Sequence, residues 1–509
     1  MFITKKIICT IIIFLIISWS ALSQEKIDDI EVIGISPLPG IEIDRNKIPN
    51  ASQSLREIDL DSSTGTTIVD LLGEKLTGVT IKDVQNSPFQ KNIDYRGFTA
   101  APLLGESQGL AVYLNGTRIN EGFGDTLQWE LVPEAALTDI DLMSSNPVFG
   151  LNALGGSLAL TTKKGLDFLN TDSSVENHFE FGGADWVNGN IELGAGDESQ
   201  GLYVAMENSY DGGWRDNSAG DVKRLFINYG KIFENSDFDF TFMNADSNLN
   251  GNGVSPTELL KVRRESVFTW PDFTSNKVYL AASNANFYLE DDSVINTSVY
   301  YRRLIRDTLN ADELDAEECA EDNETHAEQM EDDFGTADEP ICGEADGDDY
   351  EVLIDQFGNA ISNNDAIRKY GLLNKSSTMT VTWGGSAQYN INTNYLDKMH
   401  NIIIGASVDK TRTAFHSRGE LGQLHNNRTV TNLLNTEGGF ITLESIREHS
   451  GSSGGMESTN ERGDVGSAQL ASKTDYYGIY INDLFAFDDK TDITISARAN
   501  LAYVKLYDH

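Results

Sequence analysis

Residues Ser236–Asp246, with the sequence SDFDFTFMNAD, alternate apolar and polar side chains as an extended strand would use them. Phe238, Phe240 and Phe242 would share one face of that strand and the two aspartates the other, because side chains alternate faces along a strand. In a soluble β-sandwich the phenylalanines would face a protein core. In an outer-membrane barrel they would face lipid, and the aspartates would face a wet lumen.

From residue 176 onward the same alternation recurs and helical periodicity disappears. Short connections such as DESQ (197–200) and FENS (233–236) alternate with long ones, of which 307–374 and 411–471 are the longest. A transmembrane barrel has short periplasmic turns and longer extracellular loops, whereas a sandwich has no reason to alternate them. We therefore predict a large antiparallel transmembrane β-barrel with lipid-facing phenylalanines and the long loops outside the cell. The predicted strands cover 176–184, 187–196, 201–209, 222–232, 237–246, 277–289, 294–306, 375–391, 399–410, 472–487 and 491–507.

These eleven predicted strands are an odd number, and the last one runs almost to His509. Single-chain bacterial barrels have even strand numbers and close on themselves, which removes their sheet edges. The sequence therefore predicts that residues 176–509 form about half of a larger barrel and that the chain is a fragment.

The composition excludes several classes of function. The 509 residues carry a net charge of −41, which argues against binding to nucleic acid phosphates. The sequence GSSGG at 451–455 fits the nucleophile-elbow pattern, but polar loop residues follow it where that motif needs a helix. There is no HExxH, CxxC or phosphate-binding glycine loop. We expect no enzymatic activity, no cofactor and no metal site.

The first 50 residues divide into two segments. MFITKK is followed by 13 largely apolar residues and then by SALSQ, a small-residue cleavage pattern. A spanning helix needs about 20 apolar residues, so we predict a signal peptide over residues 1–23. Residues 24–50 contain the β-prone stretch IEVIGI and then SPLPG, whose prolines Pro37 and Pro39 withhold backbone donors. This segment reads as a short strand-forming peptide on a stiff linker.

Residues 51–165 have the pattern of a small α+β domain, which we call the plug. TTIVDLLGEKL places Ile68, Leu71, Leu72 and Leu76 along one side of a helix. GVTIKDV reads as a strand, and AVYLNGTRIN reads as a hairpin that turns at Asn-Gly. VPEAALTDIDLM predicts a short helix followed by a strand. About 115 residues suffice for a core of their own.

At this point the sequence resembles the TonB-dependent outer-membrane receptors, which import scarce solutes through a plugged 22-stranded barrel. The resemblance rests on IEVIG (30–34), NIDYRGF (92–98), the stretch LAVYLNGTRINEGFGDTLQWELVPEAALTDIDLM (110–143) and NPVFGLNALGGSLALTTKKG (146–165), in family order. The barrel half resembles the family only in its alternating strands and its alternating connection lengths, and not in specific motifs. The resemblance implies outer-membrane localisation, a monomer, and contacts with lipid, with the TonB protein and with a small ligand.

The resemblance also implies roles for two sets of residues. The first set would form the TonB box, which adds itself as a strand to the sheet of TonB; it comprises Ile30, Glu31, Val32, Ile33 and Gly34. The second set would support the plug rather than contact ligand; it comprises Arg96, Gly97, Gly150, Gly155 and Gly156.

Ligand contact would fall on exposed loops, by analogy with the family. The upper loops of the plug are expected at 99–108 and 120–130, and loops of the barrel at 210–216 and 268–273. The candidates mix aromatic and polar groups, as binding sites tend to; they are Phe123, Asp125, Gln128, Trp129, Tyr210 and Trp214. The alternatives are a plug loop folded on itself and aromatic side chains that sit at the membrane interface.

The segment 307–351 holds 20 acidic residues and no Lys or Arg. Its acidic side chains repel one another, which favours a solvated segment. The alternative is a cation site, because DGDDYE (346–351) offers oxygen ligands for a divalent cation. Cys319 and Cys342 lie within it, and in an exported protein such a pair predicts a disulfide, with two free thiols as the alternative.

The predicted function is TonB-dependent import across the outer membrane. Ferric siderophores are the commonest cargo of the family, while cobalamin, oligosaccharides and other metal chelates also fit. The alternative from another class is a non-transporting adhesin or a soluble β-rich binding protein, which would need no IEVIG segment and, if soluble, would turn its strands toward a protein core.

Overall fold

The fold was examined in a computed structural model of the chain. It describes residues 32–34, 36–38, 42–44, 50–61, 67–84, 86–144, 146–183, 185–318, 340–344, 350–357, 359–434, 439–443, 467–488 and 490–508. The predicted signal peptide, Ile30 and Glu31, Cys319 and most of the acidic segment lie outside the described residues.

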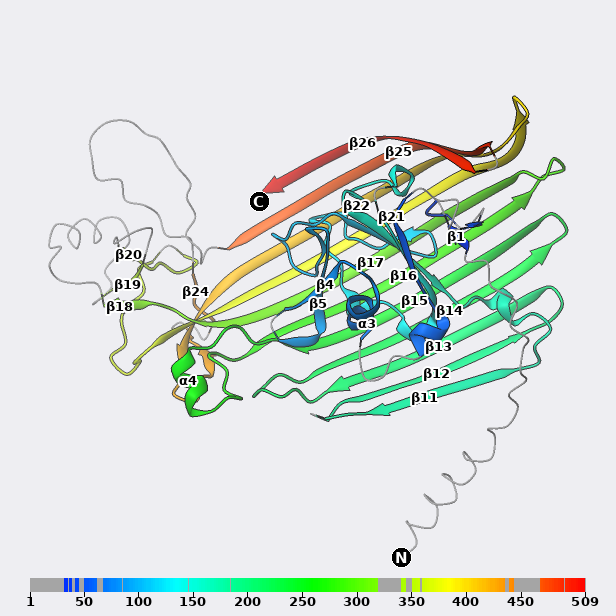
Figure 1. Cartoon of the computed structure of the whole chain (residues 1–509). Helices are drawn as coiled ribbons and strands as arrows, with labels where there is room; N and C mark the ends of the chain where they lie inside the picture. The colour runs from blue at the N-terminus through cyan, green and yellow to red at the C-terminus, as the bar shows by residue number, and fades with distance from the viewer. Residues whose placement is uncertain are drawn as a thin grey trace, which may run out of the picture.

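One antiparallel sheet dominates the molecule (Figure 1). Its eleven main strands pair in simple sequence order, so each strand is the neighbour of the next one along the chain. They are β11 (Ser174–Phe181), β12 (Val187–Gly196), β13 (Gln200–Asp211), β14 (Gly220–Phe233), β15 (Ser236–Asn250), β16 (Asp272–Tyr288), β17 (Val294–Glu313), β21 (Tyr370–Tyr395), β22 (Lys398–Leu424), β25 (Ala468–Asp488) and β26 (Thr491–Asp508). All eleven predicted strands are confirmed, and the meander is that of an outer-membrane barrel.

Connection length alternates along the sheet, as the sequence predicts. The turns β12–β13, β14–β15, β16–β17, β21–β22 and β25–β26 are short and lie at one end (Figure 1). The long connections lie at the other end and carry small elements of their own. These are α4 (Thr257–Val262), β18 (Ala316–Glu318), β19 (Ile341–Glu344), β20 (Tyr350–Val352), β23 (Val430–Asn432) and β24 (Thr442–Leu443).

The plug lies on the concave side of this sheet (Figure 1). Its larger sheet has the order β3-β9-β10-β7-β8, with β7 and β10 parallel, and its smaller sheet has the order β4-β5-β6. The elements are β3 (Ser52–Arg56), α2 (Glu57–Asp61), α3 (Ile68–Lys75), β4 (Val79–Val84), β5 (Ser87–Tyr95), β6 (Phe98–Ala100), β7 (Leu110–Leu114), β8 (Thr117–Arg118), β9 (Leu137–Met143) and β10 (Gly156–Thr162). Its apolar residues and inward residues of β13–β17 share one core.

The predicted plug elements form with one correction. The helix α3 buries Ile68, Leu71 and Leu72, and the hairpin β7–β8 turns at Asn115 and Gly116 with positive φ at both. The short helix expected in VPEAALTDIDLM is only a 3₁₀ turn at Glu134–Ala136 before β9. A single turn suffices there because Ala136 packs directly into the core.

The strand β15 answers the question raised by its sequence. Phe238, Phe240 and Phe242 point away from the plug, and Phe240 keeps 40% of its surface exposed. The expectation of a wet lumen is wrong at Asp239, which is 3% exposed. The Nδ2 atom of Asn228 donates to its carboxylate at 3.2 Å, and Lys164 of the plug lies 3.7 Å away. The plug fills the lumen at this level.

Candidate functional site

A buried ionic group joins the plug to the strands β13 and β14. Arg224 of β14 donates to the carboxylates of Glu134 at 2.9 Å and Glu207 at 2.6 Å, and to the carbonyl oxygen of Glu130 at 2.7 Å. Its side chain is 3% exposed. Burial raises the pKa of Glu134, although the positive charge of Arg224 opposes that rise. A buried charge needs such partners, so this group fixes the plug relative to the sheet.

Glu130 lies next to that group in the short 3₁₀ helix η2 (Trp129–Leu131) and is 2% exposed. Its Oε1 atom accepts hydrogen bonds from Asn276 at 2.8 Å and from Ser247 at 3.4 Å. Its Oε2 atom has no hydrogen-bond partner among the described residues. Burial raises the pKa of Glu130 to about 7, so its charge changes near neutral pH.

A second contact ties the upper loops of the plug to β17. The guanidinium of Arg302 donates to Glu121, and burial raises the pKa of that glutamate against the pull of Arg302. Arg306, four residues further along β17, donates to the carbonyl oxygen of Pro102 at 2.7 Å. Both predicted upper loops of the plug are therefore clamped to the same barrel strand.

The predicted ligand residues of the plug are mostly internal. Trp129 is 1% exposed and donates to the carbonyl oxygen of Ala100 at 3.0 Å. Gln128 is 3% exposed, and Asp125 accepts from Arg118 and Asn152. In this conformation their side chains tie the loop to the plug, and a ligand could reach Gln128 or Trp129 only after the loop opened.

The remaining ligand candidates are more exposed but do not meet at one point. Phe123 is partly exposed at the tip of the 120–130 loop. The tip of the 99–108 loop lies beside it, and Leu104 there is 54% exposed. Tyr210 lies on the outer face of β13, on the side away from the plug. Trp214 lies in the β13–β14 loop, 49% exposed, and its ring contacts the guanidinium groups of Arg215 and Arg264. Ligand contact at these residues stays a prediction.

The predicted structural residues of the plug occupy tight turns and close contacts. Arg96 and Gly97 form the β5–β6 turn, both with positive φ. Gly150 has a φ of 86°, and a Cβ atom there would lie 2.6 Å from the guanidinium carbon of Arg498 on β26. Gly155 and Gly156 abut Phe98 and the carbonyl oxygen of Met143. Gly150, Gly155 and Gly156 therefore leave no room for a side chain, while Gly97 is required by its positive φ.

The described part of the coupling segment forms a hairpin. β1 (Val32–Gly34) pairs in antiparallel fashion with β2 (Glu42–Asp44). Between them, Leu38 is 2% exposed and packs on the β7–β8 turn, where a Cβ atom on Gly116 would lie 2.9 Å from the carbonyl oxygen of Pro37. A cavity of about 40 Å³ separates this linker from inner residues of the barrel such as Asp409. The linker thus connects β1 to the β7–β8 turn of the plug.

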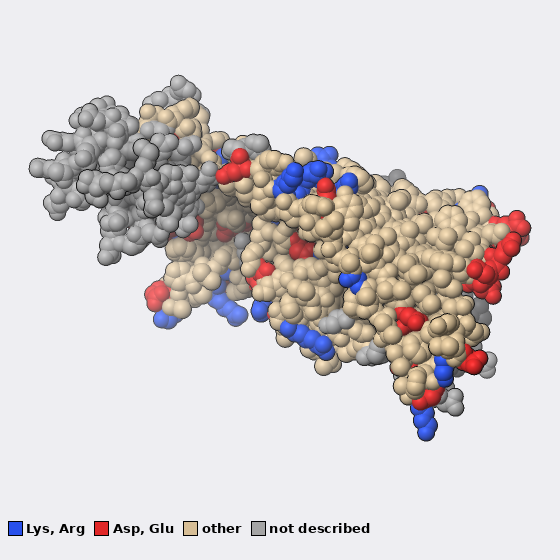
Figure 2. Space-filling view, turned by 90° about the horizontal axis from the view of Figure 1, so that it is seen from above, with Lys and Arg blue, Asp and Glu red and all other residues tan. Residues whose placement is uncertain are grey.

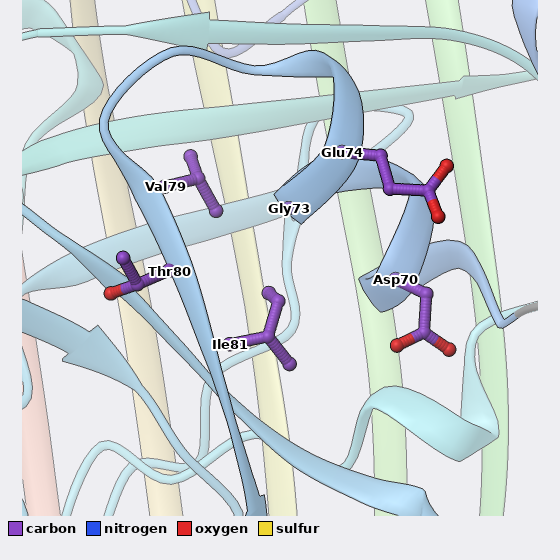
Figure 3. A pocket seen from close by; sticks show the side chains of 6 residues that line it. All are labelled: Asp70, Gly73, Glu74, Val79, Thr80 and Ile81. Carbon is purple, nitrogen blue, oxygen red and sulfur yellow. The ribbon is translucent and has the colours of Figure 1, made fainter.

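A shallow depression lies between α3 and β4 (Figure 3). Gly73 allows the helix to approach Ile81, because a Cβ atom there would lie 2.5 Å from its Cγ1 atom. The carboxylates of Asp70 and Glu74 point away from the strand, and Asp70 already pairs with Lys91. The depression results from packing and offers no convergent polar groups.

The described residues contain no cluster of three or more potential metal ligands, and none of their helices is long and apolar enough to cross a membrane. Cys342 is disulfide-bonded. Its predicted partner, Cys319, lies outside the described residues, so the pairing stays a prediction, as does cation binding by the acidic segment.

Comparisons with known proteins agree with this architecture. Residues 44–157 match the family model of the TonB-dependent Receptor Plug Domain. The ferric-catecholate import receptor Fiu from E. coli K12, in its closed form, is 11% identical, with a TM-score of 0.60 over 94% of this chain and 59% of that one. The ferripyoverdine receptor of Pseudomonas aeruginosa is 12% identical, with a TM-score of 0.58 over 94% and 55%. The ferric citrate transporter FecA is 13% identical, with a TM-score of 0.57 over 91% and 61%.

The chain spans about 55–61% of the length of the solved structures that it resembles. No curated protein matches the sequence. At these identities the solved structures establish the fold, while the plug match identifies residues 44–157 as the plug domain of TonB-dependent receptors. Receptors of this class are not enzymes. The chain therefore contains the plug domain of a TonB-dependent receptor, inside a sheet that has the fold of the outer-membrane receptor barrels.

Proposed function

We propose that this receptor binds a scarce solute at the cell surface and imports it into the periplasm with energy from TonB. The observation that carries the proposal is the placement of the linker. β1 offers a strand edge to a partner, and the linker after it is packed under the plug turn at Gly116. A pull on β1 would therefore act directly on the plug.

A ferric siderophore is the first cargo to test. The ferric-catecholate import receptor, the ferripyoverdine receptor and the ferric citrate transporter share the fold of this chain, and the names of all three refer to iron chelates. Their low identity transfers no binding residue. The cargo class is therefore proposed for the whole receptor and not for a particular set of side chains.

The test uses cells that carry the full-length gene, with Ile33→Pro compared with Ile33→Ala. Proline removes a backbone donor and resists strand pairing, whereas alanine shortens the side chain and keeps the donor. Binding and uptake of radiolabelled ferric siderophores and cobalamin are measured separately. We expect Ile33→Pro to bind its ligand normally and to lose uptake by at least tenfold, while Ile33→Ala retains most of it.

Two outcomes would contradict this proposal. Equal uptake by Ile33→Pro and the wild type would show that energy does not enter through this segment, and a passive channel would then gain support. Uptake lost equally in the proline and alanine variants would show that the side chain of residue 33, rather than strand pairing, carries the coupling.

A further inference from the structure

A row of basic side chains crosses the outer face of the sheet between β17 and β26. The strand register places Arg303, Arg412, Lys473 and Lys505 at one level, with Val381 of β21 completing the row. Four of five consecutive strands thus present a cation at the same height. Such a concentration of basic side chains is unexpected in a chain with a net charge of −41.

These side chains face away from the plug. Their sequence neighbours Arg302, Thr411 and Thr474 are buried on the inner face, and side chains alternate faces along a strand. Arg412 and Lys473 keep 47% and 42% of their side-chain surface exposed. The basic row is therefore accessible from outside the barrel.

The row carries positive charge that the protein itself does not neutralise. Arg412 lies directly opposite Lys473, which lies directly opposite Lys505, and like charges so placed destabilise a sheet. Among the described residues, the one acidic group that pairs with them is Asp475, 3.0 Å from Arg412 and 3.6 Å from Lys473. Within the part of the chain that the structure describes, Lys505 has no ion pair. The arrangement favours an external anion.

The level of the row corresponds to the lipid headgroups. One row nearer the short turns, Tyr301, Trp383 and Tyr503 are 46%, 49% and 55% exposed on the same outer face. Below them the face becomes apolar, with Ile479 64% and Leu501 53% exposed. Exposed aromatic side chains above an apolar band mark the membrane interface of a barrel. Figure 2, seen from the side of β25 and β26, shows Lys and Arg gathered above a mostly uncharged surface.

We propose that Arg303, Arg412, Lys473 and Lys505 bind the phosphate groups of an anionic lipid in the outer leaflet. Guanidinium groups bind phosphate oxygens in a bidentate manner, and lysines add point charges. The acyl chains of the lipid would lie against the apolar face below the aromatic row. The side of the sheet is that of the long loops, which corresponds to the outer leaflet. This inference is independent of the transported cargo.

The test measures lipid binding to the full-length receptor in neutral detergent by native mass spectrometry. The probes are a diphosphorylated glucosamine lipid and the same lipid without its phosphates. We expect Arg412→Gln/Lys473→Gln/Lys505→Gln to weaken binding of the phosphorylated lipid about a hundredfold, since each charge near an anionic surface contributes roughly a factor of five. The single variant Lys505→Gln, at an exposed and unpaired position, should weaken it about fivefold.

The matched control is Lys223→Gln/Lys277→Gln on the outer faces of β14 and β16. Each of these lysines has its own acidic neighbour, Asp221 and Asp246, so binding should remain within about twofold of the wild type. Equal affinity for the dephosphorylated lipid, or an equal loss in the control, would overturn the proposal. Displacement of the lipid by equimolar inorganic phosphate would overturn it too, because it would indicate a site for free phosphate.

Discussion

The two sides of the sheet hold the plug in different ways. On β13–β17 the contact combines the large shared apolar core with buried ion pairs, Arg224 with Glu134 and Arg302 with Glu121. On β22–β26 it is a small apolar cluster around Val148, together with Arg498, which donates to the carbonyl oxygen of Val148 at 3.1 Å. Buried ion pairs tolerate little displacement, because a separated partner is left as an unpaired buried charge. Apolar contacts are not directional and can slide.

This difference indicates which side of the sheet the plug would separate from first when it is pulled. The side on β13–β17 acts as a fixed anchor, and the side on β22–β26 can part at a smaller cost. The linker cavity is lined by residues of both sides, including Ser298 of β17 and Asp409 of β22. We expect a pull on the linker to separate the plug first from β22–β26.

The largest effect should come from Arg224→Met, which breaks the anchor. It leaves the carboxylates of Glu134 and Glu207 buried without their cation, a loss of about 3–5 kcal/mol in the free energy of plug docking. Hydrogen exchange of the β10 amides in the full-length receptor measures this loss. Lys223→Met, on the outer face of the same strand, is the control and should change docking by less than about 0.5 kcal/mol. Equal protection in both variants would show that Arg224 does not anchor the plug.

The next effect concerns pH and Glu130. Its pKa is raised to about 7 from 4.5 in the folded state, so its contribution to docking is complete below about pH 4.5 and is lost as the pH rises toward 7. A shift of this size corresponds to roughly 3 kcal/mol. Protection of the β10 amides should therefore fall between about pH 4.5 and pH 7 in the wild type, and less steeply in Glu130→Gln. Parallel curves for the two proteins would rule out Glu130 as the titrating group.

The smallest effect should come from Arg498→Ala on the other side. It removes a part-exposed hydrogen bond from a charged donor to the plug, for which we expect a loss of about 1–2 kcal/mol. Lys505→Ala on the same strand does not contact the plug and serves as the control. The same exchange experiment ranks the two sides. A loss for Arg498→Ala as large as that for Arg224→Met would remove the distinction between anchor and yielding side.

Much of the fold could be predicted from the sequence because local patterns decide it. The alternation in SDFDFTFMNAD fixes which side chains share a face, and the short turns fix antiparallel neighbours. The Asn115-Gly116 hairpin formed as predicted, since few other residues adopt positive φ twice in succession. Strand ends were less predictable: β22 continues to Leu424, 14 residues beyond the predicted end at 410, because pairing with β21 stabilises polar residues that show no apolar alternation.

The candidate site was harder to predict. Ligand contact by Trp129 stays a prediction, but its burial was not foreseen, because the sequence around it does not reveal that the loop folds back onto Ala100. Arg224 and Glu130 were not singled out by the sequence reasoning. A weak signal existed for Arg224, because it lies at an inward position of an alternating strand, where an arginine needs a partner.

By itself, the sequence determined the class of fold, the strand order, the two faces of each strand and the family resemblance in the plug. These follow from local periodicity and from short motifs, which neighbouring residues alone can specify. Only the tertiary structure decided which buried charges meet and which outer cations align. Glu130 and Asn276 are 146 residues apart, and Arg303 and Lys505 are brought to one level only by the register of four successive strand pairs. No local pattern encodes such contacts, because they arise only when the whole sheet pairs and curves around the plug.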